Sequence, residues 1–187
     1  MIGTLATRAR GPVDVVTGDR DLFQLVDDDR GVRVLYTNRG INDLEFVDEA
    51  AVAAKYGIPG RAYADYAVLR GDPSDGLPGV VGVGDKTAAT LINEFGSLAG
   101  IRDAVARTVV PKPPLTAALL KKLHAADAYL DAAPEVVAVV TTIDLPPVDG
   151  ALPRRPADPD ALDALAEEHG LESSVRRLGA ALGWPDR

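Results

Sequence analysis

The stretch from Arg70 to Glu94, RGDPSDGLPGVVGVGDKTAATLINE, constrains this chain more than any other part of it. Two aspartates, Asp72 and Asp75, lie in a turn that is rich in glycine and proline. A glycine-rich segment follows, and Asp85 then opens a run whose apolar spacing predicts a helix. The stretch therefore predicts an acidic turn that leads directly into a hairpin and the start of a helix.

Two parts of this stretch suit chemistry on a phosphodiester: the acidic turn suits a metal ion, and the glycines with the helix start suit a phosphate. Carboxylates in a turn suit a hard divalent cation, which prefers several oxygen ligands. Glycines let the backbone approach a phosphate closely, and a helix N-terminus presents unpaired N–H groups to an anion. Phosphodiester chemistry on a nucleic acid requires a metal site beside a site for the phosphate backbone. A structural alternative stays open at this point, namely a corner between two helices in which the glycines only make the turn.

The longer run GDPSDGLPGVVGVGDKTAATLINEFGSL resembles the helix–three-turn–helix signature of the 5′-nuclease family. That family includes flap endonucleases, bacterial 5′–3′ exonucleases and the 5′-nuclease domain of the bacterial DNA repair polymerase. Its pattern, G-D-x-S-D-[NG]-[IL]-P-G-V-x-G-[IV]-G-x-K-T-A, is matched at nearly every position, with Gly76 where asparagine is more usual. A match of this length is specific, whereas a bare G-x-G-x-K would be weak.

A second acidic pair follows an apolar run near the start of the chain. Residues 13–16 predict a buried strand, and Asp19 and Asp21 follow it. Ligands of open α/β sheets bind outside the carboxyl ends of parallel strands. Taken alone, Asp19 is better explained as the N-cap of the next helix. The run TGDRDLFQLV, however, resembles the family segment [SG]-x-D-x-D-L-x-Q-L, whose metal-binding aspartates correspond to this pair.

The resemblance implies a 5′–3′ exonuclease or structure-specific 5′-flap endonuclease that hydrolyses DNA with Mg²⁺ or Mn²⁺. The catalytic and metal-binding residues it implies are Asp19, Asp21, Asp72 and Asp75. The DNA-binding residues it implies are Gly79, Gly82, Gly84, Lys86 and Thr87. Carbonyls of the hairpin could also hold K⁺. The expected partner is duplex DNA with a 5′ end or 5′ flap, without a membrane or a small-molecule cofactor. Two rivals remain: a non-catalytic DNA-binding module and an inactive fragment.

The resemblance also implies an α/β fold, with a partial, mostly parallel sheet flanked by helices as in an incomplete PIN-like nuclease core. We expect residues 1–60 to form part of this core and residues 61–109 to form the helix–three-turn–helix element. Residues 110–187 should add helices and a returning strand. The helix expected at Met1 has no N-cap and aligns just after the family's E-A-D-D segment. We therefore expect the first strand and first metal-binding acids of the family to lie upstream of this chain, which would then be inactive alone.

Local patterns predict the remaining elements. Ile2, Leu5 and Ala6 form a candidate buried stripe of the first helix. Further strands are expected at residues 32–36 and 136–143, and further helices at residues 48–56, 61–69, 85–95, 97–105, 115–130, 160–169 and 173–182. Lys121 and Lys122 are expected on a solvated helix face, and Trp184 is expected to pack.

Composition sets outer limits on the chemistry. The 187-residue chain has no cysteine, which excludes disulfides, thiolate metal sites and a cysteine nucleophile and favours a cytoplasmic location. No apolar run approaches the ~20 residues of a membrane span. The net charge is −8, but residues 70–125 carry seven Lys/Arg and five Asp/Glu, which makes the segment with the hairpin net positive. An acidic chain of this kind predicts modest non-specific affinity for DNA.

Overall fold

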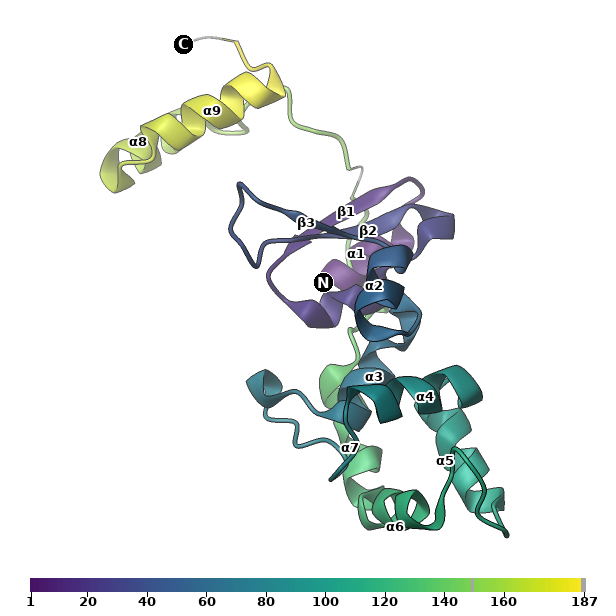
Figure 1. Cartoon of the computed structure of the whole chain (residues 1–187). Helices are drawn as coiled ribbons and strands as arrows, with labels where there is room; N and C mark the ends of the chain where they lie inside the picture. The colour runs from purple at the N-terminus through teal and green to yellow at the C-terminus, as the bar shows by residue number, and fades with distance from the viewer. Residues whose placement is uncertain (149, 186–187) are drawn as a thin grey trace. The chain divides into compact units, whose positions relative to one another are not determined.

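A computed structural model describes residues 1–148 and 150–185. It divides into two compact units, Met1–Asp144 and Leu145–Arg187, which are described separately. Figure 1 shows that the first unit carries its strands at one end and α5 and α6 at the other, with α3, α4 and α7 between them. The described residues contain no helix that is long and apolar enough to cross a membrane.

The sheet of the first unit has the order β1 (Val13–Thr17), β2 (Val32–Tyr36) and β3 (Glu45–Val47). The first two strands are parallel and β3 is antiparallel to β2. The short 3₁₀ helices η1 (Arg20–Leu25) and η2 (Asp28–Arg30) connect β1 to β2. The predicted α/β class is confirmed, although the third strand of the sheet is β3, and it runs antiparallel.

The first helix, α1 (Ile2–Arg8), forms as predicted but buries a different face. Thr4 and Ala6 are buried, whereas Ile2 and Leu5 are 48% and 40% exposed, so the predicted stripe is wrong at two of its three positions. The Thr4 hydroxyl donates to the carbonyl of Val140 and accepts from the amide of Ile143. Burial of Thr4 thus comes from the segment after α7, which the spacing of apolar residues in α1 could not indicate.

The strand predicted at residues 136–143 is also wrong. Its first two residues end α7, and the rest is extended chain that pairs with no strand among the described residues. The Gln24 side chain instead bonds this backbone, donating to the carbonyl of Val137 and accepting from the amide of Val139. Side chains of η1 and α1 therefore make hydrogen bonds to this backbone that a neighbouring strand would otherwise have made, although the run is rich in β-branched residues.

Helices make up the rest of the first unit: α2 (Glu49–Tyr56), η3 (Gly60–Ala62), α3 (Tyr63–Arg70), η4 (Pro73–Asp75), α4 (Asp85–Phe95), α5 (Leu98–Arg107), α6 (Ala117–Ala125) and α7 (Asp127–Val137). The single helix predicted at residues 115–130 is therefore two helices that meet at Ala126. The break brings Asp127 and Asp131 of α7 against Arg102 of α5. This cross-helix contact is a reason for the break that the local sequence does not carry.

An aromatic cluster joins the sheet to the helices. The ring of Phe23 lies 5.1 Å from Tyr36 and 5.4 Å from Tyr63, both edge to face. Tyr56 extends the cluster to Tyr66, with 5.7 Å between ring centroids. These geometries are the favourable ones for aromatic pairs. Tyr63 and Tyr66 are both buried, and the cluster packs α3 against the end of the sheet.

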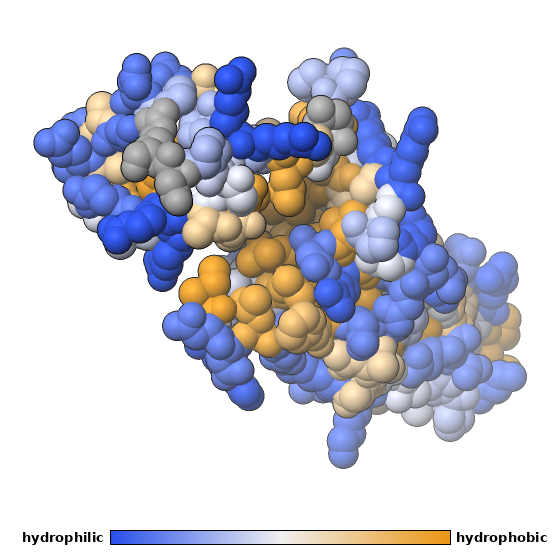
Figure 2. Space-filling model, turned by 90° about the horizontal axis from the view of Figure 1, so that it is seen from above, coloured by the Kyte–Doolittle hydropathy of each residue, from blue (hydrophilic) through white to orange (hydrophobic). Residues whose placement is uncertain are grey.

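The second unit consists of an extended segment, α8 (Pro159–His169) and α9 (Glu172–Leu182). Both helices were predicted. The indole N–H of Trp184 donates to the carbonyl of Pro153 at 2.8 Å, and the ring lies against Gly179, so Trp184 packs as expected. Figure 2 shows that hydrophobic residues remain visible among hydrophilic ones on the face it draws.

Candidate active site and nucleic-acid interface

The fold brings the two acidic pairs to one cleft. Asp19 and Asp21 follow the carboxyl end of β1, and Asp72 and Asp75 belong to the turn after α3. All four line the same hollow of the first unit. Its remaining walls are Gly18, Arg20, Tyr36, Asn38, Lys55, Tyr56 and Ser74. The two acidic pairs therefore converge in the fold, and their role as metal ligands stays a prediction.

Local hydrogen bonds shape each acidic turn. One carboxylate oxygen of Asp19 accepts from the amide of Asp21 at 2.9 Å, so Asp19 also caps η1, as the simpler interpretation of this residue expected. Asp72 caps η4 in the same way, accepting from the amide of Ser74 at 3.1 Å. A cap uses one oxygen of the carboxylate. The second oxygen of each group is left for other partners.

Asp72 is the most enclosed of the four acids, with 2% of its surface exposed. Its second oxygen lies 3.3 Å from a guanidinium nitrogen of Arg20 and 3.6 Å from one of Arg70. Burial alone would raise the pKa of this carboxyl, but hydrogen bonds from Ser74 and the charges of both arginines hold the pKa below its usual value. Asp72 is therefore ionised and already neutralised by cations of the protein itself.

Asp21 has the opposite environment. Partial burial and then the negative charges of Asp75, Asp19 and Asp72 raise the pKa of Asp21 to about 6. Burial is the larger cause of the raised pKa, and the neighbouring carboxylates add to it by repelling a further negative charge at Asp21. A bound cation would relieve that repulsion.

The donor set of the cleft fits a divalent cation in its chemistry. Carboxylate oxygens are the ligands of hard cations such as Mg²⁺ and Mn²⁺. Within residues 1–148 and 150–185, however, no three acidic, histidine or cysteine side chains stand close enough to share one ion as they are placed. Among the described residues Asp19, Asp21 and Asp75 form no ion pair, whereas Asp72 is engaged by Arg20 and Arg70. An ion here would draw these side chains together.

The glycine hairpin after the acidic turn combines one buried glycine with two exposed ones. Gly79 is buried, has φ +70°, and would place a Cβ 2.4 Å from the carbonyl oxygen of Arg70. Its amide donates to the Tyr129 hydroxyl at 3.2 Å. Gly79 therefore anchors the hairpin on α3 and α7, and its amide is already bonded. Gly82 and Gly84 are exposed and present their backbone to solvent.

The hairpin leads into the N-terminus of α4. Gly84 is the N-cap and supplies no side-chain acceptor to the first amides of the helix. Lys86 is exposed beside them, and Thr87 is half-buried. An uncapped helix start with an adjacent ammonium group favours an anion. This arrangement can bind a phosphate without reading a base.

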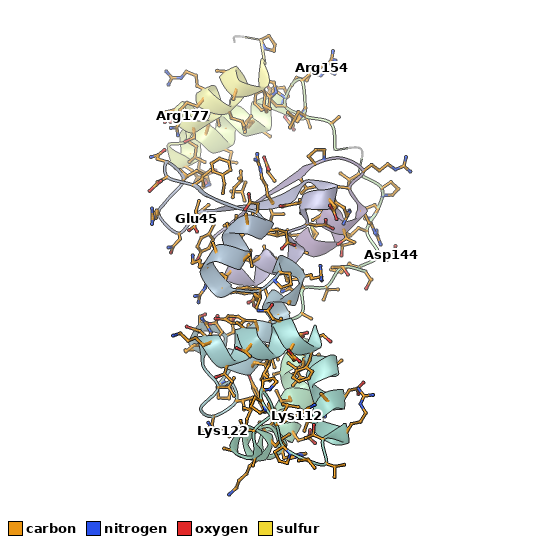
Figure 3. All side chains as sticks on the ribbon, turned by 45° about the vertical axis from the view of Figure 1, so that its right-hand side comes forward. Glu45, Lys112, Lys122, Asp144, Arg154 and Arg177 are labelled. Atoms are coloured by element: carbon orange, nitrogen blue, oxygen red, sulfur yellow. The ribbon has the colours of Figure 1, made fainter. Side chains whose placement is uncertain are left out.

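A further cation lies on the hairpin. Lys122 is exposed, as expected, and its ammonium also donates to the carbonyl of Gly82 at 3.0 Å. Figure 3 shows Lys122 at the opposite end of the first unit from Glu45 of β3. No sequence signal links α6 to the hairpin. By contrast, Arg20 and Arg70 adjoin the acidic motifs in sequence, and this position could have marked them.

Comparisons with known proteins agree with this geometry. The chain is 57% identical over 178 residues to a 5′–3′ exonuclease of Streptomyces coelicolor, covering 95% of this chain and 58% of that protein. It is 49% identical over 190 residues to a 5′–3′ exonuclease of Mycobacterium tuberculosis, covering 97% of this chain and 59% of that protein. The chain thus spans less than two thirds of the length of these relatives.

A solved structure shares the fold. The flap endonuclease of bacteriophage T5, in a pseudo-enzyme–product complex with DNA and metal ions, matches with a TM-score of 0.56 and 17% identity, covering 73% of this chain and 46% of that one. The model of the family described as "5'-3' exonuclease, C-terminal SAM fold" matches residues 58–160. Since that match spans more than half of the described sequence and includes the acidic turn, the hairpin and α4, the chain belongs to the 5′–3′ exonuclease family.

Proposed function

We propose that this chain takes part in the divalent-metal-dependent hydrolysis of DNA phosphodiesters at a 5′ end or 5′ flap. The observation that carries the proposal is the convergence of Asp19 and Asp21 with Asp72 and Asp75 in one cleft, which Arg70 links to the first residue of α4. The names of the similar proteins support the same class of reaction. Because the chain spans only part of those relatives, the activity of the whole protein is itself part of the proposal.

In this proposal Asp19, Asp21 and Asp75 bind the cation, Mg²⁺ or Mn²⁺. Asp72 becomes a further ligand when the side chains of its two arginine partners move away from its carboxylate. When bound, such an ion lowers the pKa of an attacking water and stabilises the leaving oxygen. The protein positions the carboxylate oxygens that would bind the ion. The charges of Arg20 and Arg70 help to keep Asp72 ionised. Their charges also suit the incoming phosphate.

We assign DNA binding to the element at residues 61–109. Gly82, Gly84 and Thr87 would offer backbone or hydroxyl donors to phosphates, Lys86 would offer its charge, and Gly79 would hold the hairpin in place. Such contacts position a duplex and carry no base code. A K⁺ ion on the hairpin carbonyls would have to share Gly82 with the Lys122 ammonium, which lies on that carbonyl here.

The test is cleavage of a fluorescent 5′-flap duplex by the 187-residue chain in Mg²⁺, in Mn²⁺ and in EDTA. The sequence alone led us to expect an inactive chain, whereas the convergence of the four acids predicts metal-dependent release of the 5′ product, which Asp21→Asn and Asp75→Asn abolish. Asp29→Asn, on an exposed turn outside the cleft, is the matched control and should cleave like the parent. Equal cleavage in EDTA, or by the Asp75→Asn variant, would contradict the proposed use of the metal.

A second candidate is a non-catalytic DNA-binding module. It is favoured by the arginines that neutralise Asp72 and by the spacing of the acids, which share no ion as they are placed among the described residues. This candidate predicts that the chain binds duplex DNA in Mg²⁺ and leaves it uncut. A binding titration run beside the cleavage assay separates the two candidates.

A further inference from the structure

Arg70 occupies the joint between the acidic cleft and the hairpin element. It is the last residue of α3, and 21% of its side chain is exposed. Its Nε donates to the carbonyl of Gly71 at 3.0 Å, which fixes the base of the guanidinium against the chain that enters the acidic turn. The two remaining nitrogens point to acids on two different elements.

One of these acids belongs to the cleft and the other to the DNA-binding element. Nη2 of Arg70 lies 3.6 Å from Oδ2 of Asp72, and Nη1 lies 3.7 Å from Oδ1 of Asp85, the first residue of α4. The same oxygen of Asp85 accepts from the Tyr66 hydroxyl at 2.9 Å. The guanidinium also lies over the Tyr66 ring, 5.6 Å from its centroid.

The planar shape of the Arg70 guanidinium fixes the directions in which it can contact the two acids. Its nitrogens form a rigid planar fork, whereas a lysine ammonium is a single point charge on a flexible stem. The Asp85 side chain is 72% exposed, so burial does not hold it, and its contacts with Arg70 and Tyr66 define its place. A shift of the start of α4 relative to the acidic turn would break one arm of the fork.

We infer that Arg70 is a positioning residue that holds the start of α4 and the acidic turn in one register, so that a phosphate gripped at α4 lies in line with the cleft. The inference deepens the proposed function and rests on it. Arg20 provides the comparison within the same site. It contacts Asp72 at 3.3 Å with the same kind of group, but in the described part of the chain it forms no ion pair or hydrogen bond with Asp85.

The experiment compares Arg70→Ala, Arg70→Lys and Arg20→Ala in EDTA, with thermal melts to confirm folding. One readout is hydrogen exchange at the amides of residues 85–88, and the other is affinity for a blunt duplex. Arg70→Ala should speed exchange at these amides and weaken binding about fivefold, the scale of one partly exposed ion-pair network. Arg70→Lys should fall between, and Arg20→Ala, which loses the same charge, should leave the exchange unchanged.

A double-mutant cycle separates positioning from general destabilisation. If Arg70 acts through Asp85, Asp85→Asn should alter exchange at the start of α4 in the parent and have little further effect in the Arg70→Ala background. Additive effects, or equal exchange in the Arg70→Ala and Arg20→Ala variants, would overturn the inference. A parent chain that binds no duplex would instead defeat the proposed function, and the exchange data would still decide the role of Arg70.

Discussion

The ammonium nitrogen of Lys122 lies 3.0 Å from the carbonyl oxygen of Gly82, although 40 residues separate them in the sequence. The contact ties α6 to the exposed tip of the hairpin, where Val81 is 84% exposed. A Cβ at Gly82 would lie 2.5 Å from the same nitrogen. Helix α6 thus supports the hairpin from the side and brings a positive charge to it.

Lys122→Ala should therefore weaken duplex binding more than Lys121→Ala, a change at its exposed neighbour on α6. Both variants lose one charge, but only the first loses the hairpin contact. We expect the affinity loss for Lys122→Ala to be several-fold at about 50 mM salt and to shrink as salt rises. Equal losses in the two variants would show that the contact with Gly82 contributes nothing beyond charge.

Lys86→Ala should weaken binding by about the same factor for unrelated duplex sequences, because an ammonium on a phosphate reads no base. The slope of log affinity against log salt should flatten by roughly 1. Fluorescence anisotropy on two duplexes of different sequence measures both quantities. A loss confined to one of the duplexes would contradict the assignment of Lys86 to the backbone.

Gly79→Ala and Gly76→Ala form a matched pair for testing the anchoring of the hairpin. Both glycines have φ +70°, but a Cβ at Gly79 would meet backbone at 2.4 Å, whereas a Cβ at Gly76 would have no heavy atom within 4 Å. Left-handed backbone alone should cost Gly76→Ala about 1 kcal/mol. The added overlap should cost Gly79→Ala a further ~2 kcal/mol or more. Urea unfolding measures both, and equal costs would mean that the hairpin can move away from α3.

Asp21→Asn should stabilise the chain in EDTA at pH 7. The pKa of Asp21 in the folded chain is raised to about 6, above its ordinary value of about 3.9 in unfolded chains. Between those pH values the folded state binds more protons, so stability falls as pH rises through this window and stays lower above it. Allowing for solvent screening at a partly exposed group, we expect a gain of about 1 kcal/mol for Asp21→Asn.

The pH dependence of the stability gained in Asp21→Asn tests the predicted direction of the effect. The gain from Asp21→Asn should fade as pH falls from about 7 to 4, since the parent carboxyl then becomes neutral as well. Asp29→Asn, on an exposed turn, is the control for the loss of a surface charge. A gain that persists at pH 4 would show that the ionisation of Asp21 is not its source.

Elements with a complete local signal were predictable from the sequence. Asp48 caps α2 by accepting from the amide of Ala51, and Gly57 ends the helix at φ 71°. The run at residues 32–36 becomes β2, at the centre of the sheet. The acidic pairs were found by motif, because each pair lies within one short segment whose spacing is distinctive. Their meeting in one cleft required the family resemblance as well.

The failures share one cause, which is packing between distant segments. The β-branched residues at 136–143 favoured a strand, but Gln24 and Thr4 take up the backbone groups that a neighbouring strand would have bonded. Propensity is a weak guide where tertiary contacts decide. The contacts of Arg70 with Asp85 and of Lys122 with Gly82 were missed for the same reason, since each joins residues that only the fold brings near.

The most direct test of the central claim, that the two acidic pairs form one cation site, is a titration of the ¹⁵N-labelled chain with Mn²⁺ followed by NMR. A bound paramagnetic ion broadens the amide signals around it. The account predicts that the signals of residues 18–21 and 72–76 broaden together at low Mn²⁺, that Mg²⁺ restores both sets, and that Asp21→Asn weakens the effect on both. Broadening of only one set, or broadening spread over the acidic surface and unaffected by Asp21→Asn, would contradict the account.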